Sequence, residues 1–198
     1  MSTAEATYAA ALPFPKRRLE WLAGRLAAKR AVQAYYQRHF GTAIASRDIV
    51  VATIQAGPRA GKPVVDAGVE IGITHSGDFA VGVCTAGPVG IDLEQNRMLP
   101  PLLVRALSPP AEAESARHRT RLDTMAPTLQ WACREAVLKY FGFGLRVDPR
   151  EIELLRWHDD GSFSWKAGPR IHKMATPLRW PRRTLAVDAV GYSLALVL

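Results

Sequence analysis

Two acidic side chains stand two positions apart in the segment VGIDLEQNR, residues 89–97. The alternating pattern predicts a strand, and strand side chains at i and i+2 point to the same face, so Asp92 and Glu94 should lie together. Two like charges on one face repel each other unless water screens them or a cation lies between them. The pair therefore indicates either an ordinary solvated face or a cation site.

A second acidic group stands in LQWACREAVLKYFG, residues 129–142, whose apolar positions predict a helix. At about 100° per residue, Trp131, Glu135 and Lys139 fall in line on a face separate from the apolar stripe. An exposed Glu–Lys pair at this spacing is common and contributes only roughly 0.2–0.5 kcal/mol, so this group alone does not indicate function.

The two groups together suggest a magnesium site. Mg²⁺ prefers oxygen ligands and is usually held by a few carboxylates together with substrate phosphates and waters. Glu135, rising from a helix across a cleft, would join Asp92 and Glu94 in a cradle of three carboxylates. Lys139, one helical turn farther on, could then contact a phosphate bound to the metal.

The composition is that of a globular chain with a sizeable core, at 198 residues with 48% hydrophobic and 22% charged. The net charge of +8 suits a partner that carries phosphates or acidic groups, and charge alone does not choose among such partners. Cys84 and Cys133 lack metal-ligand spacing and are expected to be reduced core residues. Without a signal-peptide pattern or an apolar run of membrane length, we expect a cytoplasmic protein with no membrane segment.

The order of predicted elements indicates an α+β fold of two halves that meet near residues 95–105, with a ligand cleft between them. A long helix is expected over 16–40, a strand over 48–54, and a dense β segment up to residue 94. Ser108, followed by two prolines, predicts the start of another helix. The helix over 128–141 should end at Gly142, and four strands should follow.

Five segments in order resemble the motifs of the 4′-phosphopantetheinyl transferase superfamily: EWLAGRLAAKRAV (20–32), GKP (61–63), THSG (74–77), VGIDLE (89–94) and WACREAVLK (131–139). The resemblance spans residues 16–142, and the strand-rich tail is similar to that of the larger, surfactin-type members. It implies two similar α/β halves related by a pseudo-twofold, each with a small antiparallel sheet packed on a long helix. We assign these halves to residues 1–98 and 99–198, with the active site in the cleft between them.

The resemblance also implies an activity and its site residues. Members transfer the phosphopantetheine arm of coenzyme A to a serine of an apo carrier protein and release adenosine 3′,5′-bisphosphate. By position, the Mg²⁺ ligands would be Asp92, Glu94 and Glu135, and the catalytic residues Glu135 and Lys139. Contacts to coenzyme A would come from Arg18, Arg25, Lys62, Thr74, His75, Asp92 and Lys139.

The proton of the carrier serine could pass to Glu135, to a metal-bound water, or to Glu112 or Glu114 on the helix after Ser108. The expected partner is an acidic acyl or peptidyl carrier protein, the enzyme is expected to be a monomer, and no nucleic acid or membrane is expected. The pathway (fatty acid, polyketide or nonribosomal peptide), tolerance of acylated coenzyme A and preference for Mg²⁺ over Mn²⁺ stay open. The alternatives are a basic nucleic-acid-binding module, another Mg²⁺-dependent phosphoryl-processing enzyme, and an inactive relative kept as a binding protein.

Overall fold

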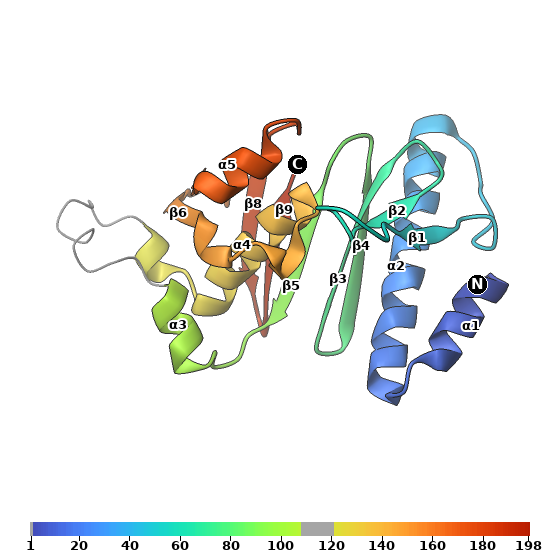
Figure 1. Cartoon of the computed structure of the whole chain (residues 1–198), viewed down its shortest axis with the longest axis horizontal. Helices are drawn as coiled ribbons and strands as arrows, with labels where there is room; N and C mark the ends of the chain where they lie inside the picture. The colour runs from blue at the N-terminus through green and yellow to red at the C-terminus, as the bar shows by residue number, and fades with distance from the viewer. Residues whose placement is uncertain (1, 108–120) are drawn as a thin grey trace.

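A computed structural model describes residues 2–107 and 121–198, and in this part the chain has a mixed α+β fold, as predicted. The helices are α1 (Thr3–Ala11), α2 (Pro15–Phe40), α3 (Pro101–Leu107), α4 (Pro127–Phe141) and α5 (Pro169–Ala175) (Figure 1). The strands are β1 (Val51–Thr53), β2 (Pro63–Val65), β3 (Glu70–Ser76), β4 (Phe79–Thr85), β5 (Gly90–Gln95), β6 (Ile152–Trp157), β7 (Phe163–Ala167), β8 (Thr184–Ala189) and β9 (Tyr192–Val197).

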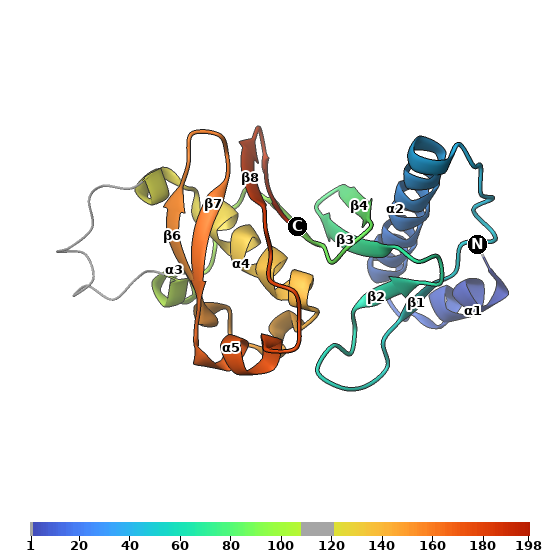
Figure 2. The same cartoon turned by 90° about the horizontal axis from the view of Figure 1, so that it is seen from above.

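The strands form small antiparallel sheets rather than one large one. Three are hairpins, β1–β2, β3–β4 and β6–β7, and the fourth has the order β5–β9–β8. The order of helix, hairpin, hairpin occurs first as α2, β1–β2, β3–β4 and again as α4, β6–β7, β8–β9. Seen from above, α2 and α4 lie on opposite sides of the molecule with β3 and β4 between them (Figure 2). This repeated order is what a pseudo-twofold relation between two halves requires.

Helix α2 confirms the predicted helix over 16–40. It starts with Pro15, whose missing N–H costs nothing in a first turn, and ends at Gly41, which has a φ of 64°. The helix packs on β3 and β4 around a small core that includes Ala28, Val32 and Ile71. Gly82 on β4 permits this approach, because a Cβ there would collide with the backbone of α2.

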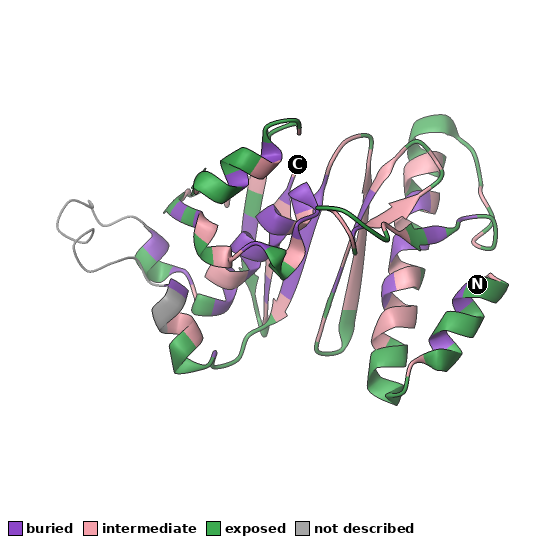
Figure 3. Ribbon diagram, in the orientation of Figure 1, coloured by how far each residue is buried: buried purple, intermediate pink, exposed green. Residues whose placement is uncertain are grey.

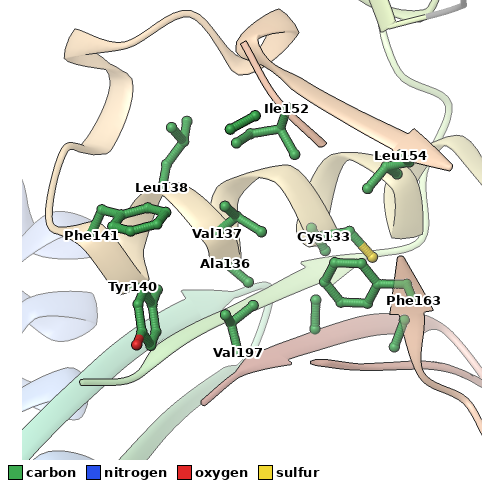
Figure 4. Packing of buried hydrophobic residues seen from close by; sticks show 14 of the residues in the cluster. Cys133, Ala136, Val137, Leu138, Tyr140, Phe141, Ile152, Leu154, Phe163 and Val197 are labelled. Atoms are coloured by element: carbon green, nitrogen blue, oxygen red, sulfur yellow. The ribbon is translucent and has the colours of Figure 1, made fainter. Parts of the chain in front are cut away.

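Helix α4 lies on the sheet of β5, β9 and β8 and contributes more buried residues to the larger core than any other element. It ends at Gly142, as predicted, where φ is 80°. The side chains of α4 interdigitate with those of β6, β7 and β9 (Figure 4), and buried residues are concentrated around this helix (Figure 3). Cys133 is a free buried cysteine of this core, and Cys84 is free and half-buried. Neither forms a disulfide, and Cys84 packs against the smaller core rather than inside it.

The two packed units meet where β3 runs beside β5. These strands are not paired by backbone hydrogen bonds; instead, the backbone N–H of Leu93 donates to Thr74 Oγ1 at 3.0 Å and that of Gln95 donates to Ser76 Oγ at 3.0 Å. Side-chain hydroxyls of β3 thus replace the carbonyl groups that a neighbouring strand would offer to β5. The spacing of β3 from β5 therefore depends on two hydroxyl residues of the THSG segment.

Several local predictions differ from the structure. The strand predicted over 48–54 is shortened to Val51–Thr53, and α1, α3 and α5 were not predicted. Strand β5 falls within residues 1–98 of the sequence but pairs with β9 at the other end of the chain, so the division at residue 98 stays a prediction. The predicted helix after Ser108 lies outside the described residues. No helix of the described residues combines the length and apolar character needed to cross a membrane.

Candidate functional site

Asp92 lies at the centre of the site, on β5 where that strand faces β3 and α4. Its carboxylate is buried, with a residue exposure of 3%, and Oδ1 accepts hydrogen bonds from Lys139 Nζ at 2.5 Å and from Thr74 Oγ1 at 3.2 Å. Its other oxygen, Oδ2, is buried without a hydrogen-bond partner. A strand residue, a helix lysine and a hydroxyl from a second hairpin therefore converge on one carboxylate.

Glu94 and Glu135 face the same cavity as Asp92. Glu94 is half-buried and accepts a hydrogen bond from Ser76 Oγ at 3.3 Å, while Glu135, on α4, is 8% exposed and its Oε1 has no partner. The cavity measures about 260 Å³ and is lined by Ile73, Thr74, His75, Asp92, Glu94, Trp131, Glu135, Lys139 and Leu145. The strand spacing and the helix spacing thus bring the two acidic groups of the sequence to one pocket.

The acids of this cavity repel one another. Burial raises the pKa of Glu135 to about 7, and the negative charges of Asp92 and Glu94 add to the effect while Lys139 opposes it. The pKa of Glu94 is raised by burial and then by the charge of Asp92. Burial also raises the pKa of Asp92, against the charge and hydrogen bond of Lys139. A single lysine does not compensate this group of carboxylates, and a further cation would relieve the repulsion.

The three carboxylates are not gathered into a closed metal site. Among the residues that the structure describes, no group of three or more His, Cys, Asp or Glu side chains is close enough to hold a metal ion. The ammonium of Lys139 pairs with Asp92 Oδ1. The donor set nevertheless fits a hard divalent cation such as Mg²⁺, because Asp92 Oδ2 and Glu135 Oε1 are carboxylate oxygens without partners.

A larger cavity of about 390 Å³ adjoins the first and shares Ile73, His75 and Lys139 with it. Its wall comes from α2, from the loop that leads into β2, from β3 and from the end of α4. The predicted coenzyme A residues Arg25, Lys62, His75 and Lys139 line it, together with Glu20, Trp21, Gly24, Thr53, Ala60, Gly61, Pro63, Ile71, Gly72, Ile73, Val89, Ile91, Gly142, Gly144 and Arg146. Cationic groups and a partly apolar floor suit a ligand with phosphates and a flat apolar part.

The cations of this larger cavity are held by neighbouring side chains. The Arg25 guanidinium lies 4.8 Å from the centre of the Trp21 ring and donates to Thr53 Oγ1 at 3.1 Å. Lys62 is buried and donates to Glu70 Oε2 at 2.7 Å. Burial lowers the pKa of Lys62, and the hydrogen bond and charge of Glu70 oppose this. Both cations are therefore fixed before any ligand arrives.

Arg18 is not brought together with the other predicted site residues. Its guanidinium donates to the carbonyl oxygen of Ala10, in the last turn of α1, at 3.2 Å and to that of Leu12, just after α1, at 3.0 Å, and Arg18 lines neither cavity. Glu112 and Glu114, the alternative bases, lie outside the described residues.

The structure adds Trp21 and Arg146 to the larger cavity. Arg146 donates to the carbonyl oxygens of Pro58, Ala60 and Gly142, so it links the loop before β2 to the end of α4. No spacing in the sequence indicates this, because the loop and Arg146 are more than 80 residues apart along the chain. Trp21 could have been identified from its position four residues before Arg25 on the same helix face.

A mixed α+β chain that gathers carboxylates and a lysine beside a cationic cavity has the chemistry of an enzyme for a phosphorylated substrate. A family model described as the 4′-phosphopantetheinyl transferase superfamily matches residues 88–196, more than half of the chain and including Asp92, Glu94, Glu135 and Lys139. The chain belongs to this superfamily, as predicted, and is a transferase of phosphopantetheine; coenzyme A is the substrate of the superfamily, which is generally metal-dependent. No match was found among curated proteins.

Proposed function

We propose that this protein transfers 4′-phosphopantetheine from coenzyme A to a serine of an apo acyl or peptidyl carrier protein, with Mg²⁺, and releases adenosine 3′,5′-bisphosphate. We further propose that it is a cytoplasmic monomer of the surfactin type whose halves are residues 1–98 and 99–198. One observation carries the proposal: Asp92, Glu94, Glu135 and Lys139 line a single cavity that adjoins a larger cationic one.

The larger cavity is the proposed binding site for the nucleotide end of coenzyme A. Arg25 and Lys62 would pair with its phosphates, and His75 and Lys139, which line both cavities, would lie at the pyrophosphate. Charge-assisted hydrogen bonds from fixed donors are roughly twice as strong as neutral ones, which suits the anchoring of a highly charged substrate.

The smaller cavity is the proposed site of the reaction. Asp92, Glu94 and Glu135 would hold Mg²⁺, which, when bound, neutralises the negative charge of the pyrophosphate. Lys139 already pairs with Asp92 Oδ1 at 2.5 Å, so its ammonium is oriented before substrate binds. The same ammonium would stabilise negative charge that develops on the leaving phosphate, an interaction that is stronger in the transition state than in the ground state.

Glu135 is the proposed acceptor of the serine proton. Its carboxylate lines the cavity, so it could accept the proton directly or through a metal-bound water. The remaining candidates, Glu112 and Glu114, are not described by the structure.

The proposed protein partner is an acidic carrier protein. The chain carries 26 Lys and Arg against 18 Asp and Glu, and such an excess speeds the encounter with an acidic partner and orients its docking.

A mass measurement tests the proposal. Incubation with coenzyme A, Mg²⁺ and an apo carrier should add about 340 Da to the carrier through covalent attachment of the arm. The gain should be absent when the carrier serine is replaced by alanine, when EDTA is present, and with the Glu135→Gln variant. Asp48→Asn, which neutralises an exposed acid in an irregular segment before β1, is the matched control and should be fully active. Absence of the adduct on every acyl and peptidyl carrier, with tight binding of DNA or RNA instead, would favour the nucleic-acid module.

A further inference from the structure

Helix α1 lies outside the matched residues 88–196 and at the edge of the molecule against α2 (Figure 1). Ser2 and Glu5 form a capping box, in which Ser2 Oγ accepts from the N–H of Glu5 at 3.2 Å and Glu5 Oε2 accepts from the N–H of Ser2 at 2.7 Å. A capping glutamate normally faces water. Here Glu5 is buried and turned toward α2.

Glu5 forms a buried ion pair with α2. Its Oε2 accepts from Lys29 Nζ at 2.7 Å, and the side chains are 5% and 4% exposed respectively. Removing two charges from water is costly, and apolar side chains of similar volume often give equal or greater stability. Stability alone is therefore a weak reason for this pair.

The second oxygen of Glu5 is not used in the ion pair with Lys29. Glu5 Oε1 is a buried acceptor without a partner, and Arg25 Nε is a buried donor without a partner. The two side chains also interact electrostatically. Burial lowers the pKa of Arg25, and the negative charge of Glu5 opposes that change. Arg25 and Lys29 are four residues apart and so share one face of α2.

Helix α1 supports the Arg25 side chain at a second point. Tyr8 packs on Trp21 with ring centroids 4.9 Å apart, and Trp21 carries the Arg25 guanidinium on its ring at 4.8 Å. Thr53 Oγ1 accepts from Arg25 Nη2 on another side. Trp21, Arg25 and Thr53 all line the 390 Å³ cavity. Helix α1 therefore contacts one wall of that cavity through the charge of Glu5 and through the packing of Tyr8 on Trp21.

We propose that Glu5 is a positioning residue for the anion-binding cavity: Oε2 holds Lys29, while the negative charge of the same carboxylate attracts the Arg25 guanidinium and keeps it oriented, with its free donors available to a phosphate of the nucleotide. This inference rests on the proposed function, in which that phosphate belongs to coenzyme A. A guanidinium held by Thr53, by the Trp21 ring and by the charge of Glu5 loses little conformational freedom when it binds, so the gain is in substrate affinity.

The experiment compares Glu5→Gln with the double variant Glu5→Met/Lys29→Met, which replaces the ion pair by apolar side chains. Calorimetry without metal gives the Kd for coenzyme A and for adenosine 3′,5′-bisphosphate, and transfer kinetics give KM and kcat. Glu5→Gln should raise Kd and KM roughly fivefold to tenfold, the effect of losing one orienting charge, with kcat unchanged. The double variant should recover the wild-type melting temperature yet keep the raised Kd.

Two results would overturn the inference: wild-type or tighter binding by Glu5→Gln, and recovery of Kd together with melting temperature in the double variant. The latter would make α1 only a structural brace. Arg25→Gln separates this inference from the proposed function. If wild type does not bind coenzyme A, or Arg25→Gln binds it as tightly as wild type, the assignment of the cavity itself is wrong. If Arg25→Gln binds weakly and Glu5→Gln binds normally, only the role of Glu5 is wrong.

Discussion

Replacing Glu135 by glutamine should make the metal-free protein more stable while it abolishes transfer. Glu135 is 8% exposed, and its pKa is raised to about 7 by burial first, then by the charges of Asp92 and Glu94, against the charge of Lys139. The folded protein therefore holds this carboxylate in its ionised form only at a cost. Glutamine has nearly the same shape and carries no charge, so the cost disappears.

The size and pH dependence of the effect follow from proton linkage. The ordinary pKa of Glu135 is 4.5 and the folded value is about 7. At about 1.4 kcal/mol for each tenfold difference in proton affinity, the ionised side chain lowers the free energy of unfolding by at most about 3 kcal/mol. Because the folded pKa is the higher one, the wild type loses this stability as pH rises from about 4.5 to 7. The penalty is complete at pH 8 and absent below pH 4.5.

Urea denaturation in EDTA, at pH 4.5 and pH 8, measures the difference. At pH 8 we expect Glu135→Gln to unfold with up to about 3 kcal/mol more free energy than wild type, and at pH 4.5 the two should be nearly equal. Added Mg²⁺ should stabilise wild type more than the variant, since the variant lacks one proposed ligand. Asp48→Asn controls for the loss of an exposed acid. A variant less stable than wild type at pH 8, or a difference that does not change with pH, would refute the reasoning.

Three further changes test the site and the packing that holds it. Lys139→Met should lower kcat about 100-fold because it removes a preoriented positive charge, while the circular dichroism spectrum stays that of wild type; an unchanged kcat would exclude Lys139 from the chemistry. Thr74→Val should lower the free energy of unfolding by about 1–3 kcal/mol because the buried N–H of Leu93 loses its acceptor, and Thr74→Ser should keep most of it; equal urea midpoints for the two variants would contradict this. Gly90→Ala should destabilise the protein by about 3 kcal/mol or more, since its Cβ would enter the backbone of α4, whereas Gly87→Ala has room; a wild-type melting temperature for Gly90→Ala would show that the helix can shift.

Local sequence patterns predicted the elements that carry the reactive groups. The period of two predicted that Asp92 and Glu94 share a face of β5, and the period of 3.6 predicted that Glu135 and Lys139 share a face of α4. Both features depend on neighbours along the chain, so a short segment contains the information. The helix end at Gly142 could be predicted for the same reason, because glycine itself readily adopts the left-handed conformation that ends a helix.

Contacts between distant segments could not be predicted in this way. Nothing in the sequence indicates that Lys139 pairs with Asp92, that β5 pairs with β9, or that Arg18 turns to the α1–α2 connection rather than to the cavity. Each contact depends on which surfaces are buried against each other, and burial is a property of the whole packed chain. The same holds for Glu5, which forms a capping box with Ser2 and is a buried counter-ion only because α1 packs on α2.

The sequence by itself therefore determined which residue types are available and which helix or strand face each one occupies. Only the tertiary structure decided that three carboxylates and a lysine share one cavity, that this cavity joins a cationic one, and that Glu135 has a pKa near neutrality. The physical reason is that electrostatic interaction depends on distance and on exclusion of water, and both are set by packing between segments far apart along the chain.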